Sequence, residues 1–183
     1  YNTAQPFHLS NAQKIVKQKF SFMNSYSSIF MGFLTSLQNS QINIKNISIS
    51  SLDMTRKDLV TFFNKMNQIN SFKSLTSFSL SKTTFDDFPI DSFSEFIMEH
   101  GEIESISMSS IQVDGTQLFS AICECEPLMY EIHLNDIVFS SQLKFDDKSA
   151  SLMMPCNLTL ADFSHSKFIH DSLGPIIQFL TSS

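Results

Sequence analysis

Pairs of apolar residues two positions apart recur along the chain, and most are followed by a turn and by apolar residues at helical spacing. Alternation of this kind is typical of a strand with one buried face, and spacings of three and four are typical of an amphipathic helix. The clearest copy runs from Ile103 to Val113, with Ile106 and Met108 as its central pair. The central pairs are Phe7/Leu9, Ile47/Ile49, Phe78/Leu80, Ile106/Met108, Ile132/Leu134 and Leu158/Leu160.

The successive steps between these pairs are 40, 31, 28, 26 and 26 residues. Periods of about 20 to 50 residues, with one strand and one helix per unit, indicate a repeat protein whose neighbouring units bury a continuous core. We therefore predict an α/β fold, a solenoid or horseshoe of about six repeats. Its parallel strands would line the concave face and its helices the convex face, and residues 1–183 would form a single domain.

The helical spacing also predicts where the helices lie. They are expected near Ser27 to Gln38, Arg56 to Gln68, Asp91 to Glu99, Thr116 to Cys125 and Ser172 to Thr181. Residues 13–25 are expected to be an insertion in the first repeat, a loop or a small hairpin. Asp91 or Ser92 is a candidate N-cap of its helix, and the poor periodicity from Gln142 to Met154 predicts an irregular return.

Composition favours a folded core and argues against several classes of function. The chain has 19 Phe and 9 Met but no Trp, and it is 42% hydrophobic and 16% charged, which disfavours disorder. No run approaches the roughly 20 apolar residues needed to span a bilayer. Because the chain begins at Tyr1 and ends after an apolar helix without a polar cap, we expect a fragment of a longer repeat array.

Charge and cysteine usage further limit the expected partners and cellular location. The net charge is −6, and the basic residues of the first fifty positions are four dispersed lysines, which disfavours a nucleic-acid partner. Cys123, Cys125 and Cys156 are odd in number and lack the spacing of a disulfide framework or a zinc site. These observations favour a reducing, cytoplasmic location.

The phrase Leu/Ile-x-x-Leu/Ile-x-Leu/Ile followed by a helix resembles the leucine-rich repeat of the ribonuclease-inhibitor type, over nearly the whole chain. The sequence departs from that pattern at the ladder position, where Asn or Cys is usual. The residues there are Ala12, Leu52, Thr83, Ile111, Ile137 and Phe163. The resemblance implies a protein-binding scaffold without catalytic activity.

Two phrases are also similar to repeats of CARMIL proteins, cytoplasmic and membrane-associated regulators of actin capping protein. Their apolar residues are Leu158, Leu160, Phe163, Leu173, Ile177 and Leu180 in one and Phe78, Leu80, Phe93, Phe96 and Ile97 in the other. This similarity implies a role in actin capping and the cytoskeleton, with the actin capping machinery as partner. No capping-protein-binding motif can be matched, so it implies no site.

Residues that flank the central pairs should point out of the concave face, because side chains alternate along a strand. The candidate protein-binding residues are His8, Asn46, Ser48, Ser77, Ser79, Ser105, Ser107, Glu131, His133, Asn157 and Thr159. Tight curvature alone can also require small residues there. Docking faces normally carry aromatic or Arg anchors, so the acidic loops near Asp86 and Asp146 and the lysine-bearing insertion remain alternative contact surfaces.

The sequence offers little basis for catalysis. It has no glycine-rich phosphate loop, paired-histidine zinc motif or nucleophile elbow, and we predict no cofactor and no metal. Glu131 and His133 could form an acid/base pair with a nearby serine, but a solvated polar patch explains them better. The alternatives to an intracellular scaffold are a secreted or cell-surface recognition protein, the repeat region of an enzyme or switch protein, and a spacer between domains.

Overall fold

The computed structural model describes residues 18–23, 27–38, 40, 42–51, 54–82, 87–123, 129–140, 158–169, 174 and 176–177; of residues 18–23, 27–30 and 123 it describes the backbone alone. Strands and helices alternate along it. The elements are β1 (Gln18–Met23), α1 (Ser27–Leu37), β2 (Ile44–Ser50), α2 (Arg56–Gln68), the 3-10 helix η1 (Asn70–Phe72), β3 (Ser77–Ser81), α3 (Ile90–Glu99), β4 (Ser105–Ser109), β5 (Gln112–Val113), α4 (Gly115–Cys123), β6 (Glu131–Asn135), β7 (Val138–Phe139) and β8 (Leu160–Asp162).

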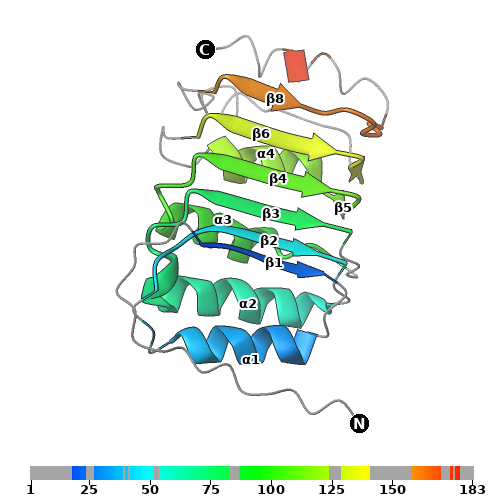
Figure 1. Cartoon of the computed structure of the whole chain (residues 1–183). Coiled ribbons are helices and arrows are strands. Elements are labelled where there is room, and N and C mark those ends of the chain that lie inside the picture. The colour runs from blue at the N-terminus through cyan, green and yellow to red at the C-terminus, as the bar shows by residue number, and fades with distance from the viewer. Residues whose placement is uncertain are drawn as a thin grey trace.

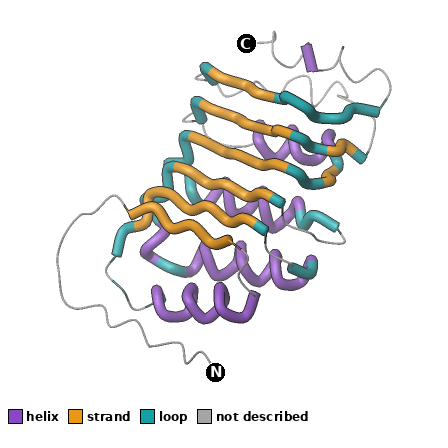
Figure 2. Tube along the Cα trace, turned by 45° about the vertical axis from the view of Figure 1, so that its right-hand side comes forward, coloured by secondary structure: helices purple, strands orange, loops and turns teal. Residues whose placement is uncertain are grey.

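The fold is α/β, as predicted, and its main sheet is parallel. Six strands pair in the order β1-β2-β3-β4-β6-β8, and β5 pairs with β7 in a second, two-stranded ladder. Helices α1 to α4 lie on one face of the six-stranded sheet (Figures 1 and 2). We call the opposite face, which none of the described helices covers, the open face.

The predicted register is confirmed in the middle of the sheet. From β2 to β6 the first residues of the central pairs stand directly opposite one another, Ile47 with Phe78, Phe78 with Ile106, and Ile106 with Ile132. All of them are at most 1% exposed. Because the side-chain period of a strand is two, this register also fixes which residues lie on the open face.

The first strand differs from the prediction. Gln18–Met23 lies in the segment 13–25 that was expected to be an insertion, yet it pairs in parallel with β2, with Phe20 opposite Ile47. The apolar pair Phe20 and Phe22 stands 27 residues before Ile47 and Ile49, a more regular step than 40. Phe7 and Leu9, where the strand was expected, lie outside the described residues.

The last strand also differs, in register. The prediction aligned Leu158 with Ile132, a step of 26 residues, but the structure places Ala161 opposite Ile132. Leu160 is consequently 44% exposed, and Phe163 takes the inward position beside Phe119, with ring centroids 5.9 Å apart. The predicted register was wrong because Leu158 and Leu160 match the repeat motif better than Ala161 and Phe163 do.

Each strand of the six-stranded sheet from β2 to β8 is followed within three residues by a residue with a left-handed backbone, and none of these residues is glycine. They are Ser51, Lys82, Ser110, Asp136 and His165, with φ between 49° and 61°. At the first four, the backbone N–H donates to a carbonyl of the next unit, as from Lys82 to Ser109 at 2.9 Å. The turns therefore have one common geometry, although their residue types differ.

The ladder position is the residue directly after each left-handed residue, and in the last unit the register of β8 changes which residue occupies it. Ser166, and not Phe163, follows the last left-handed residue. Its hydroxyl accepts a hydrogen bond from the Ile137 N–H at 3.0 Å and donates one to the Leu134 carbonyl. A polar side chain thus bridges two backbone groups of the preceding turn, whereas Ile111 and Ile137 fill the equivalent position with buried apolar side chains.

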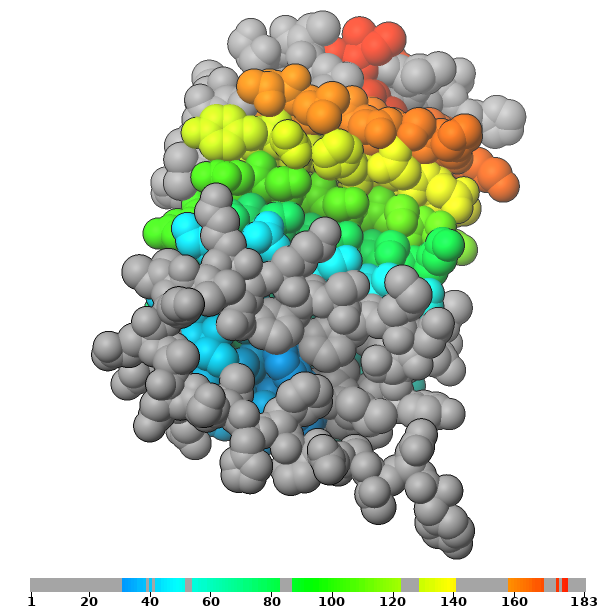
Figure 3. Space-filling model, viewed as in Figure 1, coloured from blue at the N-terminus to red at the C-terminus, as the bar shows by residue number. Residues whose placement is uncertain are grey.

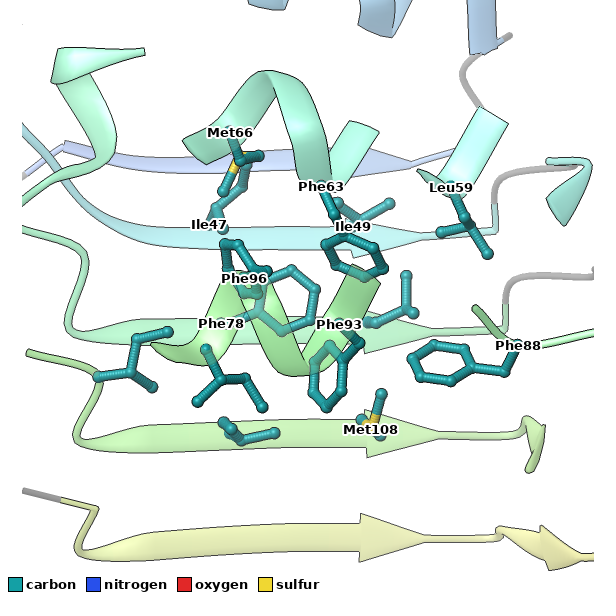
Figure 4. Packing of buried hydrophobic residues seen from close by; sticks show 14 of the residues in the cluster. Ile47, Ile49, Leu59, Phe63, Met66, Phe78, Phe88, Phe93, Phe96 and Met108 are labelled. Atoms are coloured by element: carbon teal, nitrogen blue, oxygen red, sulfur yellow. The ribbon is translucent and has the colours of Figure 1, made fainter. Parts of the chain in front are cut away.

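Phenylalanines form the centre of the core between the sheet and the helices. Phe78 of β3 has its ring centroid 6.1 Å from Phe63 of α2 and 5.1 Å from Phe96 of α3, and all three side chains are 0% exposed (Figure 4). Phe93 and Phe88 extend the group. Aromatic contacts add to the free energy gained by removing these large side chains from water.

Helix α2 begins and ends at the predicted residues, and Thr55 caps it. The Thr55 hydroxyl accepts the Asp58 N–H at 3.2 Å, and the Asp58 carboxylate accepts the Thr55 N–H at 3.0 Å, which is a capping box. The predicted cap of α3 is wrong, because that helix starts at Ile90 after Pro89 and has no side-chain cap. Of the last predicted helix, residues 174, 176 and 177 are described and helical.

Candidate functional site

The open face is lined by rows of small polar side chains. From β2 to β4 they are Asn46, Ser48, Ser50, Ser77, Ser79, Ser81, Ser105, Ser107 and Ser109, all partly exposed. On β6 the rows continue with Glu131, His133 and Asn135. In Figure 3 the strands β4, β6 and β8, in green, yellow and orange, form parallel ridges on this face.

Most of the predicted face residues therefore lie together, from Asn46 on β2 to His133 on β6. His8 and Asn157 lie outside the described residues. Thr159 is exposed, but it precedes β8, and its hydroxyl donates to the Tyr130 carbonyl at 3.0 Å. The positions expected for Asn157 and Thr159 are occupied by Leu160, opposite Glu131, and Asp162, opposite His133.

His133 lies between two carboxylates at the β8 end of the open face. Its Nε2 is 3.5 Å from Oε2 of Glu131, and its Nδ1 is 4.0 Å from Oδ2 of Asp162. The side chains of the two acids are 50% and 39% exposed. Solvent therefore reaches this group, and it belongs to the surface and not to a buried pocket.

Hydrogen bonds hold the Asp162 carboxylate in place. Its Oδ2 accepts from Nδ2 of Asn135 at 2.8 Å, and its Oδ1 accepts from the Ser164 N–H at 2.9 Å. These bonds lower the pKa of Asp162, the Asn135 bond most strongly, and the nearby His133 lowers it further. Asp162 is accordingly ionised at neutral pH.

The geometry limits what this group can do chemically. Both ring nitrogens of His133 face carboxylates, and among the described residues no hydroxyl is hydrogen-bonded to either nitrogen. The Ser164 hydroxyl instead accepts from Asn135 at 2.6 Å. In the described part of the chain no cluster of three or more His, Cys, Asp or Glu residues has the arrangement of a metal site.

Sequence reasoning placed Asn135 on the face but missed Asp162 and Leu160 as face residues. The error follows from the register of β8, since a shift of three residues exchanges inward and outward positions. The sequence does contain a signal for the correct register. Ala161 and Phe163 alternate with the polar Asp162, which is the pattern of a strand with Ala161 and Phe163 facing inward.

Comparisons with known proteins identify no relative. No protein-family model, no curated protein sequence and no solved structure matches the chain. Within the described residues, no helix is both long and apolar enough to cross a membrane.

Proposed function

We propose that this chain is a leucine-rich-repeat solenoid of the ribonuclease-inhibitor type that acts as a non-enzymatic, cytoplasmic scaffold and binds a protein partner on its open face. Three properties of the chain support the solenoid. The strands of the six-stranded sheet are parallel and follow one another in chain order, helices lie on one side, and a left-handed residue recurs after β2, β3, β4, β6 and β8. Such stacking of short units creates extended binding surfaces.

The observation that carries the proposal is the unbroken register of the open face from β2 to β6. Its residues are partly exposed, none of the described helices covers it, and its small side chains let a partner's backbone approach the sheet closely. The open face is therefore a continuous surface over four neighbouring strands.

A pair of bulky substitutions tests this proposal. Ser79→Arg with Ser107→Arg places two long side chains in the middle of the open face, and the matched control is Gln68→Arg with Gln117→Arg on the helices, which adds the same charge. Each protein is used as bait with a cell extract, and recovered proteins are identified by mass spectrometry. Partners lost with the first pair and retained with the second support the proposal; retention with both contradicts it.

A narrower proposal is a role in actin capping. It is supported by the phrase from Phe78 to Ile97, because all five apolar residues on which the similarity was based are buried in one strand and helix unit. The second phrase gives less support, since Leu160 is exposed. Purified actin capping protein is the probe for this version, and the absence of binding to the bait, measured by calorimetry, would reject it while leaving the scaffold proposal intact.

A further inference from the structure

Charge is unevenly distributed over the open face. From β2 to β4 the outward residues are Asn46 and serines, which carry no charge. Both formal charges of the face between β2 and β8 are negative, on Glu131 and Asp162, and no Lys or Arg occupies an outward position of these strands. Between β2 and β8, one end of the face is therefore anionic, and the serine rows carry no charge.

The two carboxylates keep unused capacity to accept hydrogen bonds. A carboxylate has about four lone-pair sites, and Asp162 accepts hydrogen bonds from the Asn135 amide, the Ser164 N–H and the Ser164 side chain, which leaves at least one site. These bonds also restrict the rotation of the side chain. A charged partner group that binds to Asp162 would thus lose little additional entropy by fixing it, which increases affinity.

One apolar side chain borders Glu131, and an exposed aromatic residue precedes Glu131 in the chain. Leu160 stands opposite Glu131 in the sheet and is 44% exposed, and Tyr130, just before Glu131, is 38% exposed. The two segments are joined by the hydrogen bond from the Leu160 N–H to the Tyr130 carbonyl at 3.1 Å. Such a combination of an exposed aromatic ring, an aliphatic side chain and fixed charges is typical of a protein-binding surface.

We propose that the β8 end of the open face, formed by Glu131, His133, Leu160 and Asp162 and flanked in the chain by the exposed Tyr130, binds a basic side chain of a protein partner next to an apolar one. This inference rests on the function proposed above and specifies its partner. Arginine fits best, because its planar guanidinium can donate two parallel hydrogen bonds to one carboxylate. The apolar neighbour would pack on Leu160, and the partner's backbone would continue over the serine rows.

The test begins with a random peptide library displayed on phage, selected against the whole chain. The enriched peptides are synthesised with a fluorophore, and their dissociation constants are measured by anisotropy. The neutralised variant is Glu131→Gln with Asp162→Asn, in which each side chain keeps an oxygen acceptor. Its matched control is Glu95→Gln with Glu99→Gln on α3, which removes two exposed charges from the helical side. Circular dichroism checks that each variant is folded.

The expected result is enrichment of Arg or Lys beside an aromatic or aliphatic residue. Binding should weaken by up to about fivefold for each neutralised charge, the range expected for an exposed charge pair, and fall in high salt. The control variant should bind as tightly as the wild type. A reversed variant, Glu131→Lys with Asp162→Lys, should select acidic peptides instead.

Three other outcomes overturn the inference. If Ser79→Arg with Ser107→Arg abolishes binding but the peptides carry no basic residue, or the neutralised variant binds them as well as the wild type does, the β8 end is not the contact and the scaffold proposal stands. If no selected peptide is blocked by the arginine pair, both proposals fail. Tight binding to the reversed variant by the original peptides would also reject the charge argument.

Discussion

A buried histidine should make this protein sensitive to mild acid. His100, at the C-terminal end of α3, is 2% exposed, and its ring lies 4.7 Å from that of Phe96. Neither ring nitrogen has a hydrogen bond of normal geometry. Burial lowers the pKa of His100 from 6.5 to about 4, and the smaller opposing effect comes from the backbone of Phe72. The folded protein thus holds this side chain neutral.

The sign and size of the effect follow from proton linkage. Between pH 6.5 and pH 4 the unfolded chain binds a proton at His100 that the folded chain does not, so stability falls as the pH falls. The full difference corresponds to about 3 kcal/mol below pH 4, and about 2 kcal/mol is already lost at pH 5. The lowered pKa of Asp162 acts below this window, because its contribution is lost only as that carboxylate protonates.

Urea unfolding followed by circular dichroism at pH 7 and pH 5 measures this loss. His100→Leu removes the titrating group and keeps the site apolar, so its stability should change by about 2 kcal/mol less between the two pH values than that of the wild type. His165→Asn, at an exposed histidine, is the control and should behave like the wild type. Equal losses in the wild type and His100→Leu would refute the reasoning.

Three further substitutions probe the turns, caps and core by the same unfolding assay. Thr55→Ala should cost about 1 kcal/mol by removing the cap of α2, whereas Thr61→Ala inside the helix should change stability by less than about 0.5 kcal/mol; equal effects would contradict the capping argument. Lys82→Gly should stabilise by about 0.5 to 1 kcal/mol, because φ there is 49°. Lys73→Gly, at φ −60°, should destabilise by a similar amount, and a gain there would disprove the backbone explanation. Phe78→Ala should cost about 3 to 5 kcal/mol, and a loss below about 1 kcal/mol would show that the ring is not packed as described.

Much of the fold could be predicted from the sequence, namely those segments whose hydrophobic periodicity and length indicate the same type of element. Helix α2 was predicted to the residue, because its apolar positions recur at three and four between clear boundaries. The strands β2, β3, β4 and β6 were placed correctly because each contains two large apolar residues separated by a single polar one. These elements carry most of the core and most of the open face.

The two ends of the sheet could not be predicted in the same way. At β1 two segments show the same alternation, one at Phe7 and one at Phe20, and pairing with β2 selects the second. At β8 the inward residues Ala161 and Phe163 are a weaker signal than Leu158 and Leu160, and only contacts with Phe119 and Phe168 decide between them. Tertiary packing, which no local pattern contains, determined both registers.

The hydrogen bonds of the left-handed turns make neighbouring units depend on one another in a fixed direction. The N–H of Ser51 is satisfied by Ser81, that of Lys82 by Ser109, and that of Ser110 by Asn135. A unit thus completes the turn of the unit before it. Removal of one unit would leave a backbone N–H of its predecessor without its acceptor. We therefore expect unfolding to proceed unit by unit from an end of the sheet, and each lost unit should lower the free energy needed to unfold the next.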